Sequence, residues 1–199
     1  MSMYSSAELT DILSIRLSKK RFQHSLNVAD EAEKLAEKYD YYSPEKAYLT
    51  GLLHDICKEI PKEEQLAMAK KSALDVSTVE LATPPLYHAV AGAWYAENVL
   101  NVHDNDMLNA IRYHTVGRAG MSRLEEIIYI ADLISADRSY KDVAKMRKNA
   151  YQSIEKAMLE ALRFSVSDVV AKGSMLPHHT IEAYNYYVSE KKKERTEIQ

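Results

Sequence analysis

Six polar residues interrupt the apolar helical segments of this sequence, and their side chains could assemble into a metal site. They are His24, His54, Asp55, His88, His114 and Asp132. Burial of an ionised aspartate is costly unless the carboxylate is paired or bound to a cation. Imidazole and carboxylate groups suit Fe, Mn, Zn or Ni, and the lack of cysteine ligands argues against a closed structural zinc site. The set therefore predicts a metal with positions open for water and a phosphate oxygen.

The position of each residue matters more than its type. His54 and Asp55 end a strongly apolar run over residues 49–56. His24 and Asp132 each fall on the apolar face of an expected helix. A single buried histidine is more often hydrogen-bonded than bound to a metal, and a bare His-Asp dipeptide is common. The hypothesis depends on all six residues occurring on apolar faces within one helical domain.

The elements that must position these residues are helices. Glycine and proline are scarce, with five of each, and good helix formers are abundant, so the composition predicts an all-α fold. Apolar spacing and capping signals predict helices over about 5–17, 22–39, 43–56, 61–71, 87–100, 105–114, 122–131, 151–171 and 180–189. We expect a single domain over residues 1–199, with a polar, frayed tail over 191–199.

Composition also restricts the partners and the compartment. The net charge of −3 provides no global field for nucleic acid or an anionic membrane. We find no run of about 18 apolar residues that would span a membrane and no signal peptide, and we expect no membrane partner. The lone Cys57 cannot form an intramolecular disulfide, which fits a reducing cytoplasm. These features favour a cytoplasmic protein that acts on a small molecule.

The order His … His-Asp … His … His … Asp resembles the HD superfamily of metal phosphohydrolases. Within it, the sequence is similar to the bacterial YqeK family of symmetrical diadenosine tetraphosphate hydrolases. The similarity extends over about residues 15–190 and is carried by residues 21–25, 51–58, 88–93, 111–117 and 128–138. It implies an all-helical bundle with an HD core over about 18–140 and C-terminal helices over about 141–190.

The resemblance also implies the ligands and the reaction. Residues matching the family's ligands are His24, His54, Asp55 and Asp132, and the implied metal is iron, whereas ligand chemistry alone leaves Mn, Zn and Ni open. The implied reaction is hydrolysis of diadenosine tetraphosphate to two ADP by metal-activated water. A homodimer is common among such proteins.

Phosphoryl transfer requires nearby cations, because negative charge spreads over the phosphoryl oxygens. Arg21, Lys58 and Arg138 lie close in sequence to expected ligands and are the candidates. His88 and His114 either hold a second metal or bind phosphate and protonate the leaving ADP, and the resemblance favours the latter. Catalytic roles are expected for Asp55, Lys58, His88 and His114. Substrate contacts are expected from Arg21, His24, Lys58, His88, His114, Thr115, Asp132, Arg138, Met175 and His178.

Alternatives remain at this stage. The loop over residues 173–179 either closes over the nucleotide or is a plain connection. The same ligands would also serve a hydrolase acting on another nucleotide. A non-catalytic nucleotide-binding sensor is a further alternative, although retention of every ligand and of the neighbouring cations argues against it.

Overall fold

The computed structural model describes the backbone of residues 4–197 and side chains up to residue 190, and it contains no strand within those residues. The predicted all-α fold is confirmed. The helices are α1 Ser6–Arg16, α2 Lys19–Lys38, α3 Pro44–Leu53, α4 Lys62–Lys71, α5 Thr78–Leu81, η1 Pro84–Leu86, α6 Tyr87–Asn98, α7 Asn105–Tyr113, α8 Arg123–Ile134, α9 Val143–Ala150, α10 Ile154–Ala171 and α11 His178–Glu197. None of the described helices is both long and apolar enough to cross a membrane.

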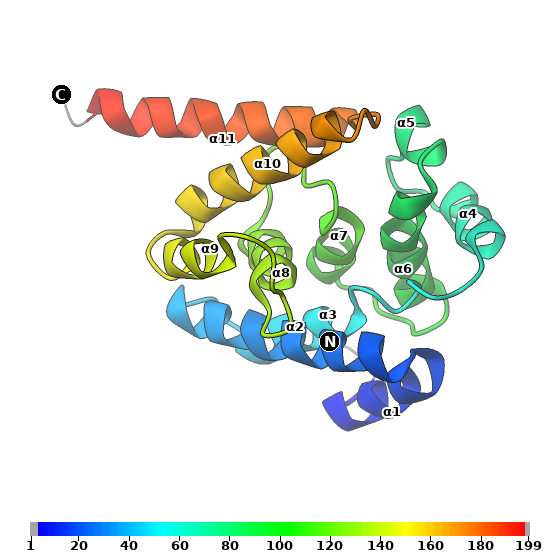
Figure 1. Ribbon diagram of the computed structural model, residues 1–199. Coiled ribbons are helices and arrows are strands. Elements are labelled where there is room, and N and C mark those ends of the chain that lie inside the picture. The colour runs from blue at the N-terminus through cyan, green and yellow to red at the C-terminus, as the bar shows by residue number, and fades with distance from the viewer. Residues whose placement is uncertain (1–3, 198–199) are drawn as a thin grey trace.

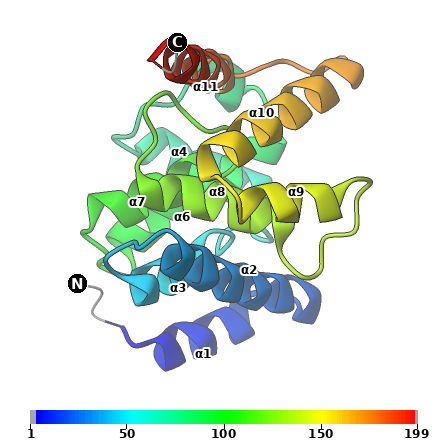
Figure 2. The same cartoon turned by 90° about the vertical axis from the view of Figure 1, so that its left-hand side faces the viewer.

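The helices are stacked in successive layers. Helix α1 lies at one end, followed by α2 and α3, then by α6, α7 and α8, with α10 and α11 at the opposite end (Figures 1 and 2). One continuous core of buried apolar side chains runs through these layers, from Leu9 in α1 to Tyr187 in α11. The interior boundary between α2, α3 and the α6–α8 layer is where polar residues from five elements meet.

A close approach of α2 and α3 positions the first two histidines. The hydroxyl of Ser18 caps α2, and the hydroxyl of Ser43 caps α3 by accepting from the Lys46 amide at 3.2 Å. Gly51 faces α2 so closely that a Cβ at this position would lie 2.7 Å from the Ala29 Cα. The absence of a side chain at Gly51 therefore lets the two backbones come together.

Several predicted boundaries are wrong. Helix α3 ends at Leu53, so His54 and Asp55 lie in the turn that follows rather than within the helix. Helix α9 was not predicted, and α10 begins at Ile154 rather than near residue 151, because Ser153 caps it through the Lys156 amide. The short α5 was also missed.

The C-terminal helix begins earlier and ends later than predicted. Helix α11 starts at His178 instead of residue 180. It continues to Glu197, so the expected frayed tail is helical as far as that residue. Lysine, glutamate and arginine are good helix formers, which explains how a polar segment extends a helix that is already nucleated. Residues 198 and 199 of the predicted tail lie outside the described residues.

Candidate metal and phosphate site

The six polar residues singled out in the sequence converge in the interior. His24 comes from α2, His88 from α6 and Asp132 from α8. His54 and His114 are the C-cap residues of α3 and α7, and Asp55 follows His54. Four different helices, together with the turn after α3, therefore bring imidazoles and carboxylates into one cluster.

Four of these residues lie close enough to share one ion. Asp132 Oδ1 is 3.0 Å from His24 Nε2 and 3.9 Å from His54 Nε2. Asp55 Oδ2 is 3.5 Å from His54 Nε2 and 4.0 Å from His24 Nε2. Metal bonds to nitrogen and oxygen of about 2.0–2.2 Å place neighbouring ligands roughly 3–4 Å apart. The ligand atoms of His24, His54 and Asp132 lie within 4.8 Å of one another, as one metal ion requires, and Asp55 lies within 4.0 Å of both histidines.

Unpaired buried atoms support this fit. His24 Nε2, His54 Nε2 and Asp55 Oδ1 are buried and form no hydrogen bond with any described residue. A buried polar atom left without a partner costs roughly 1–3 kcal/mol, and more when it is charged. A divalent cation at the cluster would satisfy nitrogen lone pairs and carboxylate charge together. The residues present therefore fit a metal.

Backbone carbonyls orient three of the imidazoles. The Nδ1 atoms of His54, His88 and His114 each lie within hydrogen-bond distance of a carbonyl oxygen three residues earlier, so we assign the proton to Nδ1. The acceptors are Gly51 at 2.6 Å, Pro85 at 2.8 Å and Ile111 at 2.7 Å. This tautomer leaves each Nε2 lone pair directed into the cluster, as a ligand or a hydrogen-bond acceptor requires.

Electrostatics hold His54, His88, Asp55 and Asp132 in their metal-binding forms, whereas the pKa of His24 is raised, because Asp132 and Asp137 outweigh the effect of burial. Burial lowers the pKa of His54 to about 4 and lowers the pKa of His88 well below its ordinary value. Burial alone would raise the pKa of Asp55, but His54, His114, His88 and Lys58 together hold it well below its usual range. The pKa of Asp132 is also lowered, because His24, His54 and Arg138 outweigh burial. Neutral imidazoles and ionised carboxylates are the forms that bind metals.

The three candidate cations lie against the ligands. Arg21 Nη1 donates to Asp55 Oδ2 at 2.8 Å, and Arg138 pairs with the Asp132 carboxylate and donates to its backbone oxygen. Lys58 Nζ is 2.9 Å from His88 Nε2 and 3.6 Å from Asp55 Oδ1. Beside the cluster, a cleft of about 340 Å³ is lined by Lys20, Arg21, His24, Asp137, Arg138, Ser139 and Tyr140. A polyanion entering this cleft meets positive charge close to the expected metal.

His88 and His114 lie on the far side of Asp55 from His24. Asp55 Oδ1 is 3.2 Å from His88 Nε2 and 3.6 Å from His114 Nε2, and the two Nε2 atoms are 3.3 Å apart. His54, Asp55 and His114 also form a group whose ligand atoms could surround an ion. The geometry therefore permits both roles foreseen for these two histidines.

The other residues predicted to contact the substrate, Thr115, Met175 and His178, do not all lie in the same part of the structure. Thr115 follows His114, and its hydroxyl is buried without a hydrogen-bond partner among the described residues. Met175 and His178 are exposed, and no hydrogen bond, ion pair or ring contact described here joins either of them to the metal ligands. Thr115 is therefore next to His114 in sequence, but within the described part of the chain no direct contact to the metal ligands is found for Thr115, Met175 or His178.

Sequence reasoning missed Asp137. Its Oδ2 lies 2.8 Å from His24 Nδ1, and its Oδ1 accepts from the Asn27 amide at 3.1 Å. A carboxylate on the second ring nitrogen fixes the orientation of a ligand histidine and raises its basicity. The available signal was the Asp-Arg pair at positions 137 and 138, of which only the arginine was assigned a role.

Comparison with known proteins places this geometry in a class. The HD domain model matches residues 21–137. The chain therefore belongs to the HD-domain family, whose domain is that of a metal-dependent phosphohydrolase. More narrowly, it belongs to the family of symmetrical bis(5'-nucleosyl)-tetraphosphatases, as three curated relatives show.

Two of these relatives and one solved structure define the extent of the similarity. The Bacillus subtilis protein is 33% identical over 87% of this chain and 92% of its own length. The Staphylococcus aureus protein is 34% identical over 86% of this chain and 89% of its own. A crystal structure from Clostridium acetobutylicum, described as a predicted HD superfamily hydrolase involved in NAD metabolism, has a TM-score of 0.90 and 40% identity. It covers 94% of this chain and 99% of that one, so the likeness includes the C-terminal helices.

Proposed function

We propose that this chain hydrolyses diadenosine tetraphosphate between its central phosphates, giving two molecules of ADP. The observation that carries the proposal is the convergence of His24, His54 and Asp132, with Asp55 within 4.0 Å of both histidines, beside three cations. The names of the curated relatives supply the substrate. The proposed metal is a single divalent ion, and iron rests on the family resemblance.

The chain's own residues position the substrate and neutralise its charge. The metal, when bound, supplies Lewis-acid chemistry and lowers the pKa of water. Arg21 and Arg138 both line the cleft beside the ligands, where their guanidinium groups would bind phosphate oxygens in pairs. Fixed positive charge of this kind stabilises the transition state, because it requires no reorganisation during the reaction.

Lys58 and His88 form a proton-holding pair. The Lys58 ammonium donates to His88 Nε2 at 2.9 Å, since the pKa of His88 is lowered by burial and its ring is neutral. We propose that a proton held at Lys58 Nζ reaches the leaving phosphate oxygen of ADP, directly or through His88. His114 Nε2, 3.3 Å from His88 Nε2, would donate to the same phosphate only when it carries a proton. General-acid help of this type contributes about 10²–10⁴-fold.

A second candidate role for this side of the site is a second metal. The grouping of His54, Asp55 and His114 favours it. Metal analysis of His88→Gln and His114→Gln separates the roles. Under our proposal, both variants keep the wild-type metal content while kcat falls about a hundredfold. Loss of half the bound metal in either variant would instead establish a two-metal site.

Product analysis tests the function itself. The purified protein is supplied with Fe, Mn, Zn or Ni in turn and incubated with diadenosine tetraphosphate, and the products are separated by chromatography. We expect ADP alone. Release of AMP and ATP would mean attack at a different phosphorus, and turnover restricted to another nucleotide would support the alternative substrate. A protein that binds ADP tightly but hydrolyses nothing would be a sensor.

The homodimer and the cytoplasmic location stay predictions.

A further inference from the structure

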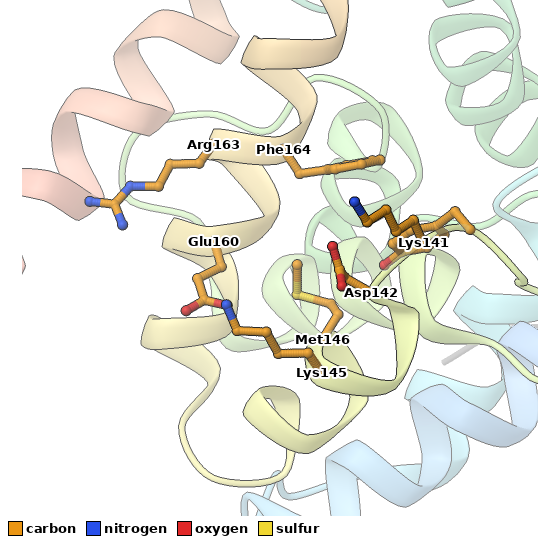
Figure 3. A pocket seen from close by; sticks show the side chains of 8 residues that line it. Lys141, Asp142, Lys145, Met146, Glu160, Arg163 and Phe164 are labelled. Carbon is orange, nitrogen blue, oxygen red and sulfur yellow. The ribbon is translucent and has the colours of Figure 1, made fainter.

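A second pocket lies next to the phosphate cleft, between α9, α10 and the loop that precedes α9. Its volume is about 390 Å³, and its lining is Tyr140, Lys141, Asp142, Lys145, Met146, Glu160, Arg163 and Phe164. Figure 3 shows Phe164 and Lys141 on one side of this pocket and Glu160 and Lys145 on the other, with the Arg163 guanidinium directed away from Phe164. No residue of this pocket was assigned a role from the sequence, and none belongs to the metal cluster.

The pocket is adjacent to the cleft beside the metal cluster, and the two share one lining residue, Tyr140. Tyr140 lines both this pocket and the 340 Å³ cleft that contains Arg21, His24 and Arg138. It follows Arg138 by two residues, and Arg138 pairs with Asp132 at the metal cluster. A phosphate chain running along the cleft from the metal would therefore arrive at Tyr140 with its far end entering the second pocket.

The pocket walls suit a nucleoside. The rings of Tyr140 and Phe164 are stacked with centroids 5.1 Å apart and planes inclined by 26°. Phe164 is 42% exposed, so part of its side chain is available to a ligand. Aromatic side chains with a free face bind bases by stacking, whatever the base.

The polar groups of the pocket suit the same occupant. The Tyr140 hydroxyl is buried and has no hydrogen-bond partner among the described residues. Lys141 forms no ion pair within the described part of the chain. An unpaired hydroxyl and an ammonium group could hydrogen-bond to the ribose hydroxyls of the second nucleoside.

We infer that the pocket of Tyr140, Lys141 and Phe164 is the subsite for the second nucleoside of the dinucleoside polyphosphate. This inference rests on the proposed function, because only a substrate with a nucleoside at both ends needs such a subsite. The two nucleoside ends of the substrate therefore have different surroundings in the protein. One ADP half is held at the metal, and the other extends through the Arg21–Arg138 cleft to the stacked rings.

The test compares two substrates with the same phosphate chain. Diadenosine tetraphosphate carries two nucleosides, whereas adenosine tetraphosphate carries one. For Phe164→Ala in the metal-loaded full chain, we expect KM for diadenosine tetraphosphate to rise about tenfold, equivalent to ~1.4 kcal/mol, with kcat unchanged. KM for adenosine tetraphosphate should stay within about twofold of wild type, because that substrate does not need the subsite.

Matched variants keep the result interpretable. Phe164→Tyr retains a stacking ring and should behave as wild type, whereas Lys141→Ala should raise KM only for the two-nucleoside substrate. An equal rise in KM for both substrates, or no rise for either, would overturn the subsite while leaving the hydrolytic function standing. Failure of the wild-type protein to release ADP would overturn the function and the subsite together.

Discussion

Two histidine clusters in this protein look alike in composition and differ in how their polar atoms are paired. In the metal cluster, His54 Nε2 is buried and has no hydrogen-bond partner among the described residues, and the carboxylate oxygens nearest to it are 3.5 Å and 3.9 Å away. In the second cluster, His179 Nδ1 lies 3.1 Å from Glu80 Oε2, and His179 Nε2 lies 3.1 Å from Asp75 Oδ2. His54 Nε2 is thus left without a partner, whereas each ring nitrogen of His179 lies within hydrogen-bond distance of a carboxylate.

The surroundings strengthen the contrast. Buried Arg112 pairs with Glu80 at 2.7 Å, and the Ser77 capping box also holds that carboxylate. Although Asp75, His178 and His179 could approach one ion, both histidines begin α11, where the helix dipole disfavours a cation. The Asp75 side chain is also 72% exposed. Glu80 therefore pairs with both Arg112 and His179 and links α5, α7 and α11, whereas His54 Nε2 in the metal cluster has no such partner.

The largest expected effect is loss of turnover on removing a ligand from the metal cluster. Asp55→Ala removes the carboxylate that lies between the two groups of histidines. We expect hydrolysis to fall at least about a thousandfold, or ~4 kcal/mol in transition-state stabilisation, with helical circular dichroism unchanged. The matched variant His179→Gln should retain turnover within about threefold in its folded fraction. Comparable activity losses in the two variants would erase the distinction between the clusters.

The second cluster should instead control stability. Glu80→Ala leaves the Arg112 guanidinium buried without its partner, which costs about 3–5 kcal/mol. Urea unfolding at pH 7 measures this loss. The double variant Glu80→Ala, Arg112→Met no longer contains the unpaired buried charge. It should recover at least half of the unfolding free energy that Glu80→Ala loses. A loss below about 1 kcal/mol for Glu80→Ala would show that the cluster is not a structural link.

A third buried carboxylate provides a pH-dependent comparison. Burial raises the pKa of Glu126 from 4.5 to about 7, although Tyr187 donates to it at 2.6 Å. The unfolded chain loses this proton first as pH rises, so the wild type loses stability between about pH 4.5 and 7. Glu126→Gln removes that dependence.

We therefore expect the stability of Glu126→Gln relative to wild type to increase by up to about 3 kcal/mol across this window and to level off above it. Urea unfolding at a series of pH values measures the difference. Glu63→Gln, at an exposed position of α4, is the control and should follow the wild type. A Glu126→Gln difference that stays flat with pH would rule out a protonated Glu126 in the folded protein.

The smallest effect concerns the approach of the helices that carry the ligands. Gly51→Ala places a Cβ against the backbone of Ala29 and should cost about 1–3 kcal/mol in unfolding free energy. Because α2 carries His24 and α3 precedes His54, metal affinity should weaken as well. Differential scanning calorimetry of the metal-free and metal-loaded protein measures both effects. Unchanged melting temperatures would mean that α2 and α3 tolerate a wider separation.

The sequence was sufficient for the fold class and for the residues that gather at the metal cluster. A histidine or aspartate on an apolar helical face must point inward, so His24, His88 and Asp132 were predictable from periodicity alone. The end of α3 at Leu53, which places His54 and Asp55 outside the helix, was less predictable. The position of a helix end depends on tertiary packing as much as on helix propensity. Helix α9 was missed because residues 143–150 form a segment of only eight residues, half of them polar.

Other features depended on long-range pairing. Asp137 contacts His24, which is 113 positions away in the sequence, and no local pattern specifies such a contact. The link between Glu80, His179 and Arg112 also joins distant segments. The loop of Met175 and His178 was given a substrate role by resemblance, and that role stays a prediction. The pocket at Tyr140 and Phe164 became visible only when α10 was placed against the loop before α9.

Metal content tests the central claim most directly. The wild type, His54→Ala and His179→Ala are purified, saturated with the same divalent metal, passed through a desalting column and analysed by inductively coupled plasma mass spectrometry. The account predicts about one ion per chain in the wild type, almost none in His54→Ala and about one in His179→Ala. Metal retained by His54→Ala, or lost from a folded His179→Ala, would contradict it.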